Sequence, residues 1–418
     1  MENKYILPYG SSEITFKITD KKVNIDVFYP PKIEDSPLNA ENVYEILCKS
    51  KLTIPENGQI AIAINDKTRP MRYDLLLIPL LHYLEEVGIP KKDITLFVST
   101  GTHTPLSPEE YVEFIPLKVV NNYQILCHDC DNADCLRYLG TTSRGTPVLI
   151  NKVFYTADIK ITLGNIEPHH FMGFSGGAKT AGIGLTGRST IEANHHLLLQ
   201  PNTLSGEYEK NPMRQDLEEI GDLIQITACL NAVMDHKKNI LRVFWDTPRT
   251  VMQQGIPESR KLTQAAIPPL YDLVITSANG FPKDINLYQA QKALTNACMI
   301  CKPGGSIILA AECREGAGNQ KYEAFMKGKS SFQQVLDEFG KIPFQIGPHK
   351  AYLIARQGLK YKLYLQSSMP DSLVKRLLLS PICSVQEMLD KLNLSGMRIA
   401  ILPYGASTMP YWDRSDSL

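Results

Sequence analysis

The segment QIAIAINDKTRPMRYDLLLIPLLHYLEEVGIPKKDITLFVS, residues 59–99, identifies the fold class. Residues 59–64 are an aliphatic run typical of a buried strand, and residues 71–90 carry apolar side chains at helical spacing until a glycine and a proline end the pattern. A second aliphatic run follows at residues 93–99. Strand, helix and strand in this order predict a βαβ unit of an α/β protein. The polar turn NDKTRP, residues 65–70, follows the first strand at its carboxyl end, where open α/β sheets bind their ligands.

The same alternation continues along the chain, whose 418 residues are enough for two domains. A second series of strand-like and helix-like runs begins at YDLVITSANG, residues 271–280. We therefore expect a larger α/β domain over residues 1–268, joined by the C-terminal segment 390–418, and a smaller α/β domain over residues 269–389. The active site is expected in a cleft between the two domains, because small-molecule sites commonly form there.

The composition indicates a small-molecule partner. The chain carries 44 basic and 44 acidic residues and has a formal net charge of zero, which favours neither a nucleic acid nor an anionic membrane surface as partner. No segment approaches the ~20 consecutive apolar residues that cross a bilayer, so we expect a cytoplasmic protein. Nine cysteines, an odd number in a chain of this size, predict reduced thiols.

One cysteine-rich stretch, CHDCDNADC at residues 127–135, contains soft donors for a metal ion. The donors are Cys127, His128, Cys130 and Cys135. A structural zinc site needs four ligands in a tetrahedron, and no matching cysteine pair elsewhere in the chain completes one. The intervening aspartates are typical of a polar loop, so we favour a loop over a zinc site.

Titratable residues gather in four short segments, DKTRP, GTHTP, PHHFMGFSGGAKT and EANHH. The residues are Asp66, Arg69, His103, His169, His170, Lys179, His195 and His196. Histidine can move protons or bind a transition metal, and a lysine amine can bond covalently to a carbonyl-type carbon. Their grouping after predicted strands or beside a glycine-rich turn favours a catalytic site over scattered packing or surface residues.

The stretch FSGGAKT, residues 174–180, is similar to a phosphate-binding loop. A P-loop requires a glycine directly before its lysine, so that the backbone can wrap the phosphates. Here Ala178 precedes Lys179, and PHHFM separates the loop from the preceding strand-like run. A P-loop-like nucleotide-dependent enzyme is therefore disfavoured, although it stays an alternative. The other interpretation is a cofactor attached to the lysine, with Gly176 and Gly177 allowing a bulky ligand to approach the backbone.

Taken in order, DKTRP, STGTHTP, EPHHFMGFSGGAKT, ANHH and YQAQK resemble the motifs of the nickel-pincer lactate racemases and their 2-hydroxy-acid racemase and epimerase relatives. The resemblance covers roughly residues 60–295. It implies an isomerase that racemises or C2-epimerises a 2-hydroxy acid by proton-coupled hydride transfer, through a transient 2-keto acid. The implied cofactor is the nickel-pincer nucleotide, pyridinium-3-thioamide-5-thiocarboxylic acid mononucleotide with Ni(II), which proteins of cofactor biosynthesis must supply.

The resemblance also assigns roles to single residues. Lys179 corresponds to the lysine that tethers the cofactor, and His195 corresponds to the histidine that ligates nickel. His103 and His169 correspond to the paired acid–base histidines. The residues implied near the substrate are Asp66, Arg69, Tyr288, Gln289 and Lys292, the last three on the smaller domain, which would close over the substrate.

Several points stay open in the sequence. A one-residue slip would exchange His169 with His170, or His195 with His196. Thr104 stands where the family often has an arginine, so lactate, malate, a longer or aromatic hydroxy acid and a sugar acid all remain candidate substrates. The oligomeric state is expected to be a monomer or a homodimer. A non-catalytic relic of the family that binds a hydroxy acid or a metal is the remaining alternative.

Overall fold

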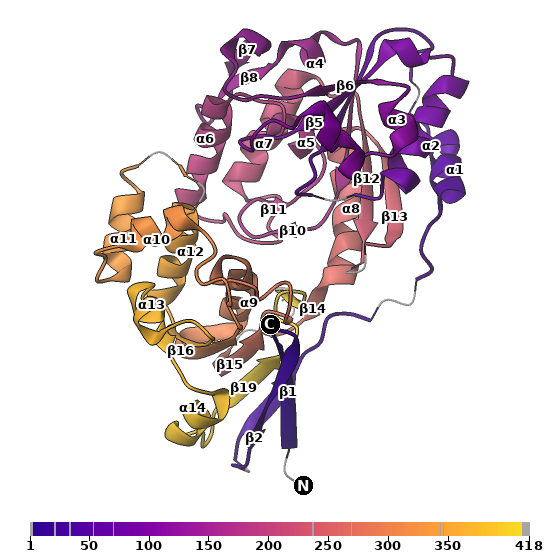
Figure 1. Ribbon diagram of the computed structural model, residues 1–418. Helices are drawn as coiled ribbons and strands as arrows, with labels where there is room; N and C mark the ends of the chain where they lie inside the picture. Colours follow the sequence, from indigo (N-terminus) through magenta and orange to yellow (C-terminus); the bar gives the residue numbers. More distant parts are fainter. Residues whose placement is uncertain are drawn as a thin grey trace. The chain divides into compact units, whose positions relative to one another are not determined.

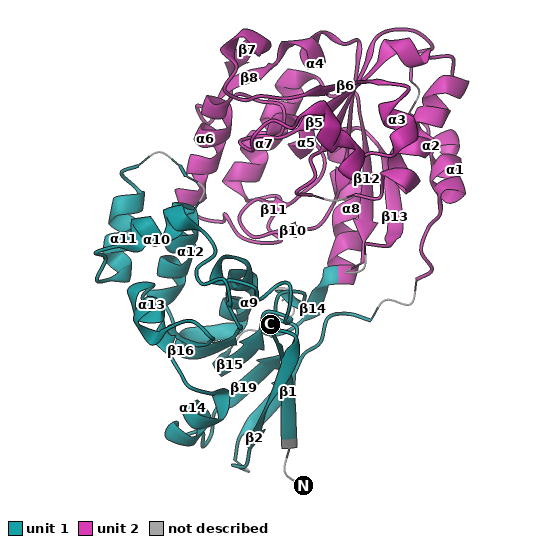
Figure 2. Ribbon diagram, viewed as in Figure 1, with its two compact units in different colours: residues 1–32, 263–418 teal, residues 33–262 magenta. Residues whose placement is uncertain are grey.

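The protein is a two-unit α/β structure. The computed structural model describes residues 3–20, 22–32, 35–52, 54–69, 71–235, 238–268, 270–342, 344–345 and 347–411. Residues 33–262 form one compact unit, called unit 2, and residues 1–32 with 263–418 form the other, called unit 1 (Figure 2). Within the described parts of the chain, no helix has the length and apolar composition that crossing a bilayer requires.

Unit 2 is built on a six-stranded sheet with the strand order β13-β12-β9-β4-β5-β6. Figure 1 labels β5, β6, β12 and β13 of this sheet. Its strands are β4 (Ile60–Asn65), β5 (Ile94–Ser99), β6 (Gln124–Cys127), β9 (Ile159–Asn165), β12 (Ala228–Met234) and β13 (Ile240–Asp246). All neighbouring strands are parallel except β13, which runs antiparallel to β12. Strand β4 is buried along its whole length, which explains the uninterrupted apolar run at the start of the quoted segment.

Both faces of this sheet are covered. Ile60, Ile62 and Ile64 pack into one apolar cluster with helix α2 (Tyr73–Glu86), whereas Ala61 and Ala63 pack into a second cluster on the other face. Helix α2 connects β4 to β5, so the βαβ prediction is confirmed. The other elements of unit 2 are α1 (Ala40–Lys49), η1 (Lys91–Asp93), η2 (Pro108–Glu113), α3 (Leu117–Val120), η3 (Ala133–Cys135), β7 (Leu136–Thr141), β8 (Pro147–Asn151), α4 (Lys152–Thr156), β10 (Pro168–His169), β11 (Gly173–Phe174), α5 (Lys179–Gly182), α6 (Arg188–His196), η4 (Leu197–Leu199), α7 (Pro212–Ile224) and α8 (Pro248–Thr263).

The chain changes direction across this sheet at β4. It proceeds from β4 to β5 and β6 on one side and later adds β9 and β12 on the other side. The carboxyl ends of β4 and β9 therefore flank a topological switch point, where the connecting segments diverge and leave room for a ligand. The motifs DKTRP and EPHHFMGFSGGAKT follow these two strands.

Unit 1 has a second six-stranded sheet, fully parallel, with the order β18-β17-β16-β15-β19-β3. Its strands are β3 (Asn24–Val27), β15 (Tyr271–Ser277), β16 (Cys301–Ala310), β17 (Lys362–Gln366), β18 (Ser380–Pro381) and β19 (Arg398–Leu402). Two further pairs are the hairpin of β1 (Asn3–Tyr9) with β2 (Ser12–Ile18) and the parallel pair of β14 (Gln264–Ala266) with β20 (Met409–Tyr411). The helices are α9 (Leu287–Ile300), α10 (Gln320–Met326), α11 (Phe332–Phe339), α12 (Pro348–Gly358), α13 (Asp371–Arg376) and α14 (Val385–Lys391).

The structure corrects the predicted membership of the chain ends. Residues 1–32 and 390–418 were expected in the larger domain, but both belong to unit 1. Strand β19 lies between β15 and β3 and pairs in parallel with each of them. Short apolar strands such as these fit either sheet, and only the pairing decides which sheet accepts them.

Candidate active site

Asp66 and His103 form the first element of the site, at the carboxyl ends of β4 and β5. His103 Nδ1 lies 2.6 Å from Asp66 Oδ2, and Thr68 Oγ1 donates to Asp66 Oδ1 at 2.7 Å. The aspartate is only 3 % exposed. Burial alone would raise the pKa of this carboxyl, but the hydrogen bonds from His103 and Thr68 outweigh burial and hold the pKa below its usual value. An ionised Asp66 accepts the Nδ1 proton, which leaves the lone pair of the imidazole on Nε2.

Lys179 is the second element, at the start of α5. Its Nζ atom is buried, and no described residue lies within hydrogen-bonding distance of it. Burial is the main reason why the pKa of this amine lies well below 10.5, and the positive charges of Arg69 and Arg214 lower it further against the opposing charge of Glu167. A desolvated lysine beside other cations is the setting in which an amine becomes a nucleophile.

The glycines before Lys179 have a structural role. Gly176 and Gly177 have φ angles of 90° and 61°, which disfavour other residues. A Cβ on Gly176 would lie 2.6 Å from Asn231 Oδ1, and a Cβ on Gly177 would lie 2.8 Å from Arg214 Nη2. Gly177 N donates to Asn231 Oδ1 at 2.7 Å, and the arginine donates to the carbonyls of Phe174 and Gly176 at 3.0 and 3.1 Å. The space beside these glycines is thus used by the protein's own buried side chains.

Helix α7 supports this loop and the helix that carries His195. On α7, Glu218 accepts from the Arg214 Nε at 2.7 Å and from the Tyr208 hydroxyl at 2.9 Å. Also on α7, Asp216 accepts from Asn194 Nδ2 at 2.9 Å. The arginine, the two carboxylates and Asn194 are at most 1 % exposed. Our sequence analysis missed these residues. The available signals were an asparagine within the apolar strand ACLNAVM and charges on the apolar face of a helix.

His195, on α6, is the third element. Its Nδ1 lies 2.8 Å from the carbonyl oxygen of Ile191, so Nδ1 carries the proton and the lone pair lies on Nε2. Burial, with the charges of Lys179 and Arg69, lowers the pKa of this histidine to about 4, although the bond to Ile191 opposes the shift. A neutral imidazole with its lone pair on Nε2 is the form that binds a metal. The neighbouring His196 is exposed to solvent.

His169 lies on β10, close to His195. Its Nδ1 accepts a hydrogen bond from the Met172 N–H at 3.3 Å, which places the ring proton on Nε2. The ring stacks on His170 with centroids 4.7 Å apart. The Phe171 ring is steeply inclined to both imidazoles, with its centroid 4.5 Å from that of His169 and 5.8 Å from that of His195, so one aromatic side chain lies beside both histidines.

Unit 2 therefore assembles most of the predicted site residues. Asp66 and His103 form one pair, and the charges of Arg69 and Lys179 act on His195. Tyr288, Gln289 and Lys292 lie in unit 1, and the expected cleft between the units stays a prediction. These three residues share the first turns of α9, whose N-cap Asn286 accepts from the Gln289 N–H at 3.0 Å. Gln289 and Lys292 are exposed, and Tyr288 is half-buried.

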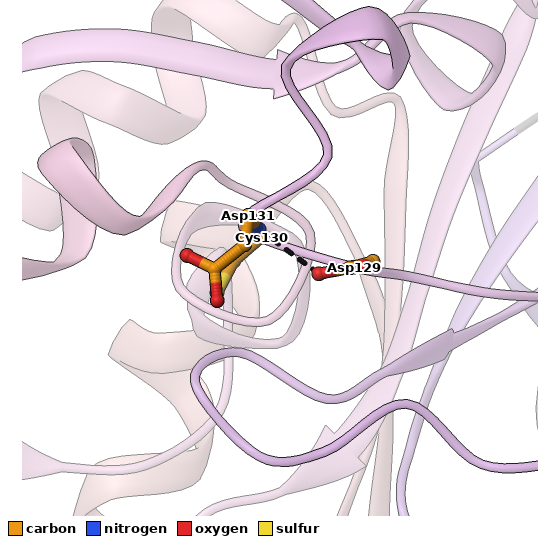
Figure 3. A group of neighbouring side chains, drawn as sticks. All are labelled: Asp129, Cys130 and Asp131. Atoms are coloured by element: carbon orange, nitrogen blue, oxygen red, sulfur yellow. Dashed lines mark hydrogen bonds between the residues drawn. The ribbon is translucent and has the colours of Figure 1, made fainter.

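The cysteine-rich loop contains one group of side chains that could hold a metal ion. Asp129, Cys130 and Asp131 bring ligand atoms within 4.8 Å of one another (Figure 3). They are consecutive residues of one turn, in which Asp131 N donates to Asp129 Oδ1 at 2.9 Å. Asp131 also forms a two-bond ion pair with Arg188 at 2.6 and 2.7 Å. His128 is buried and is not part of this group, and its Nε2 lies 3.0 Å from the Thr186 carbonyl oxygen.

The chain matches protein-family models and known proteins over most of its length. Residues 9–206 match the lactate racemase N-terminal domain, and residues 268–409 match the lactate racemase C-terminal domain. The lactate racemase of Thermoanaerobacterium thermosaccharolyticum is 27% identical over 421 residues, covering 96% of this chain and 98% of that protein. The lactate racemase of Lactiplantibacillus plantarum is 30% identical over 342 residues, covering 79% of this chain and 80% of that protein.

Solved structures agree with these matches. The lactate racemase apoprotein from T. thermosaccharolyticum superposes with a TM-score of 0.85 at 25% identity, over 98% of this chain and 100% of that chain. A Thermotoga maritima protein shares the fold, with a TM-score of 0.63 at 17% identity over 91% of this chain and 100% of that chain. The class is thus that of two-unit α/β isomerases. The chain belongs to the lactate racemase family.

Proposed function

We propose that this protein is a racemase or C2-epimerase of a 2-hydroxy acid that carries a nickel-pincer nucleotide on Lys179. The observation that carries the proposal is the buried Nζ of Lys179, which has no hydrogen-bond partner among the described residues. Burying such an amine costs free energy unless something compensates. A covalent thioamide bond removes the charge and leaves the nitrogen a single N–H, so the residue fits the cofactor that the family resemblance implies.

His195 is the proposed nickel ligand. Its Nδ1–H donates to Ile191 O, which orients the ring and directs the Nε2 lone pair away from the helix backbone. The lowered pKa of about 4 keeps this imidazole neutral at physiological pH. Imidazole together with soft sulfur donors suits square-planar Ni(II). The neighbouring His196, the alternative ligand, is exposed to solvent.

When held by Lys179 and His195, the cofactor would supply a hydride acceptor and donor for C2 of the 2-hydroxy acid, whose oxidised form is a 2-keto acid. His103 would take the hydroxyl proton at Nε2, and Asp66 would stabilise the imidazolium that forms. His169 begins with its proton on Nε2, because Nδ1 accepts from Met172. His103 is thus set to act as the base and His169 as the acid. This pairing suits a racemase, which must convert both enantiomers of its substrate.

The substrate's carboxylate requires a cationic partner. Arg69 is exposed, and its charge acts on both Lys179 and His195. A guanidinium beside the reacting groups can bind a carboxylate in two-bond geometry. On unit 1, Tyr288, Gln289 and Lys292 are proposed to contact the same substrate. Lactate is the substrate named for the relatives, and it is the first candidate here.

The test is mass spectrometry of the intact protein and its peptides, with nickel analysis, after co-expression with the cofactor-making proteins of the family. We expect a sulfur-containing mononucleotide adduct on Lys179, about one nickel per chain, and interconversion of D- and L-lactate in a chiral assay. The Lys179→Ala variant is the control and should show neither adduct nor turnover. An unmodified Lys179 in a host proven to make the cofactor would contradict the proposal.

A further inference from the structure

Asp216, on α7, is a buried carboxylate that accepts hydrogen bonds from two other parts of unit 2. Its Oδ1 accepts from Thr142 Oγ1 at 2.6 Å. Its Oδ2 accepts from Thr146 Oγ1 at 2.8 Å and from Asn194 Nδ2 at 2.9 Å. The two threonines lie in the connection between β7 and β8, and the asparagine lies on α6. The side chain is 0 % exposed, so these donors replace the water that a carboxylate requires.

Asn194 ties the last turn of α6 to α7. It directly precedes His195, and its Nδ2 donates both to Asp216 and to the carbonyl oxygen of Met213, the latter at 3.0 Å. Its Oδ1 is buried and has no hydrogen-bond partner among the described residues. An apolar side chain at this position would avoid the unsatisfied oxygen, but it could not bond to α7. The buried amide therefore fixes one register between the two helices.

The first turn of α6 is connected to the same carboxylate through β8. Thr190 Oγ1 donates to the carbonyl oxygen of Pro147 at 2.7 Å and accepts from the Leu149 N–H at 3.0 Å. Pro147 directly follows Thr146, whose hydroxyl donates to Asp216. Figure 1 shows α7 beside α6 and β8 near one end of that helix. Both ends of α6 are therefore held by elements that bond to Asp216.

The imidazole of His195 is in turn fixed to α6. Its Nδ1–H donates to the carbonyl oxygen of Ile191 at 2.8 Å, one turn earlier in the same helix. This bond sets the orientation of the ring relative to the helix, but it does not set where the helix lies. The position of the Nε2 lone pair within unit 2 therefore depends on the bonds that hold α6, and Asp216 joins them.

We propose that Asp216, acting through Asn194, is the positioning residue for His195 as a nickel ligand. The nickel part of this proposal rests on the proposed function, whereas the attachment of α6 to α7 does not. A metal–imidazole bond requires the lone pair to be directed at the ion, so a displaced helix weakens it. Polar groups that orient a metal ligand in this way typically contribute about 10- to 100-fold to metal affinity.

Three variants separate this role from general stability. Asn194→Ala removes both bonds to α7, and alanine favours the helix, so a weaker helix cannot explain its effect. Asp216→Asn is the conservative variant, because an amide oxygen can still accept from Asn194 while its NH₂ group faces a threonine hydroxyl. Thr146→Val is the matched control, since it removes one bond to the same Oδ2 atom and leaves the Asn194 bonds intact.

Hydrogen–deuterium exchange of the full-length, cofactor-free protein tests the attachment of α6. Its amides should exchange about 10- to 100-fold faster in Asn194→Ala, the range expected for two lost buried hydrogen bonds. Asp216→Asn and Thr146→Val should stay close to wild type. Asn194→Ser, which has a single short donor, should lie between alanine and wild type, and it replaces the alanine variant if that variant does not fold. Unchanged exchange of α6 in both Asn194 variants would refute the attachment.

Release of nickel from the loaded protein tests the positioning role. Nickel per cofactor adduct is followed during dialysis against a chelator. We expect release about 10- to 100-fold faster in Asn194→Ala, with Asp216→Asn and Thr146→Val close to wild type. Release at the wild-type rate from an Asn194 variant with faster exchange would refute positioning and leave a structural contact. If wild type carries neither adduct nor nickel, the proposed function and the nickel role both fail, and the exchange result alone decides whether α6 is attached through Asp216.

Discussion

Replacing Lys179 by methionine should stabilise the cofactor-free protein while abolishing cofactor attachment. Methionine has a similar length and lacks the amine, whose Nζ is buried without a partner among the described residues. An unsatisfied buried polar group costs about 1–3 kcal/mol. The free energy of unfolding of unit 2 should therefore rise by about this amount in the Lys179→Met variant.

Urea unfolding of the cofactor-free protein measures this change. Trp245 is buried on β13 of unit 2, so its fluorescence reports on this unit when Trp412, outside the described residues, is replaced by phenylalanine. A gain of about 1–3 kcal/mol corresponds to a midpoint shift of about 0.5–1.5 M for a typical urea dependence. Lys160→Met is the control, and it should lower the stability because its Nζ donates to two carbonyl oxygens.

The pH dependence has a definite sign. The pKa of Lys179 is lowered on folding, so between the folded pKa and 10.5 the unfolded chain binds more protons than the folded chain. The destabilising effect of this lysine is therefore complete below its folded pKa and disappears as the pH rises towards 10.5. The advantage of methionine should shrink over the same window. If Lys179→Met lowers the stability at neutral pH, the amine has a stabilising partner and the argument for the attachment site fails.

Three other changes test the site. Asp66→Asn should lower kcat for racemisation by about 10²- to 10⁴-fold, because the imidazolium of the partner histidine loses its counter-charge, while bound nickel stays constant; unchanged turnover in a chiral assay would remove the aspartate from the mechanism. His195→Ala should lower the nickel content measured by elemental analysis, whereas the exposed neighbour variant His196→Ala should keep it, and the reverse result would exchange their roles. Gly176→Ala should cost about 1–3 kcal/mol or more in urea unfolding, since its φ is 90° and the new Cβ would lie 2.6 Å from a buried amide oxygen. Gly145→Ala is the control, because Gly145 has a φ of 86° and open space around it, so this variant measures the backbone strain alone. Equal losses of stability in the two variants would show that the contact with the amide oxygen is unimportant.

The relation between sequence and site can be followed at particular residues. The uninterrupted apolar run within Ile60–Asn65 and the helical spacing of Tyr73–Glu86 made the first βαβ unit predictable, because both patterns are local. The motifs DKTRP, GTHTP and PHHFMGFSGGAKT were likewise readable, since each follows a strand. The role of Gly176 was not. The glycine stays a proposed cofactor-binding residue, and only the structure shows that a Cβ there would lie against Asn231, which is distant in sequence.

The sequence alone was enough for the α/β class, the two-domain organisation and the order of the motifs, because these depend on local periodicity and on short residue patterns. Folding decided which sheet receives the chain ends, through the pairing of β19 with β15 and β3. It also decided which lysine loses its hydration. Lys179 looks like an ordinary lysine in the sequence, and its lowered pKa arises only from the burial and the neighbouring charges that tertiary packing creates.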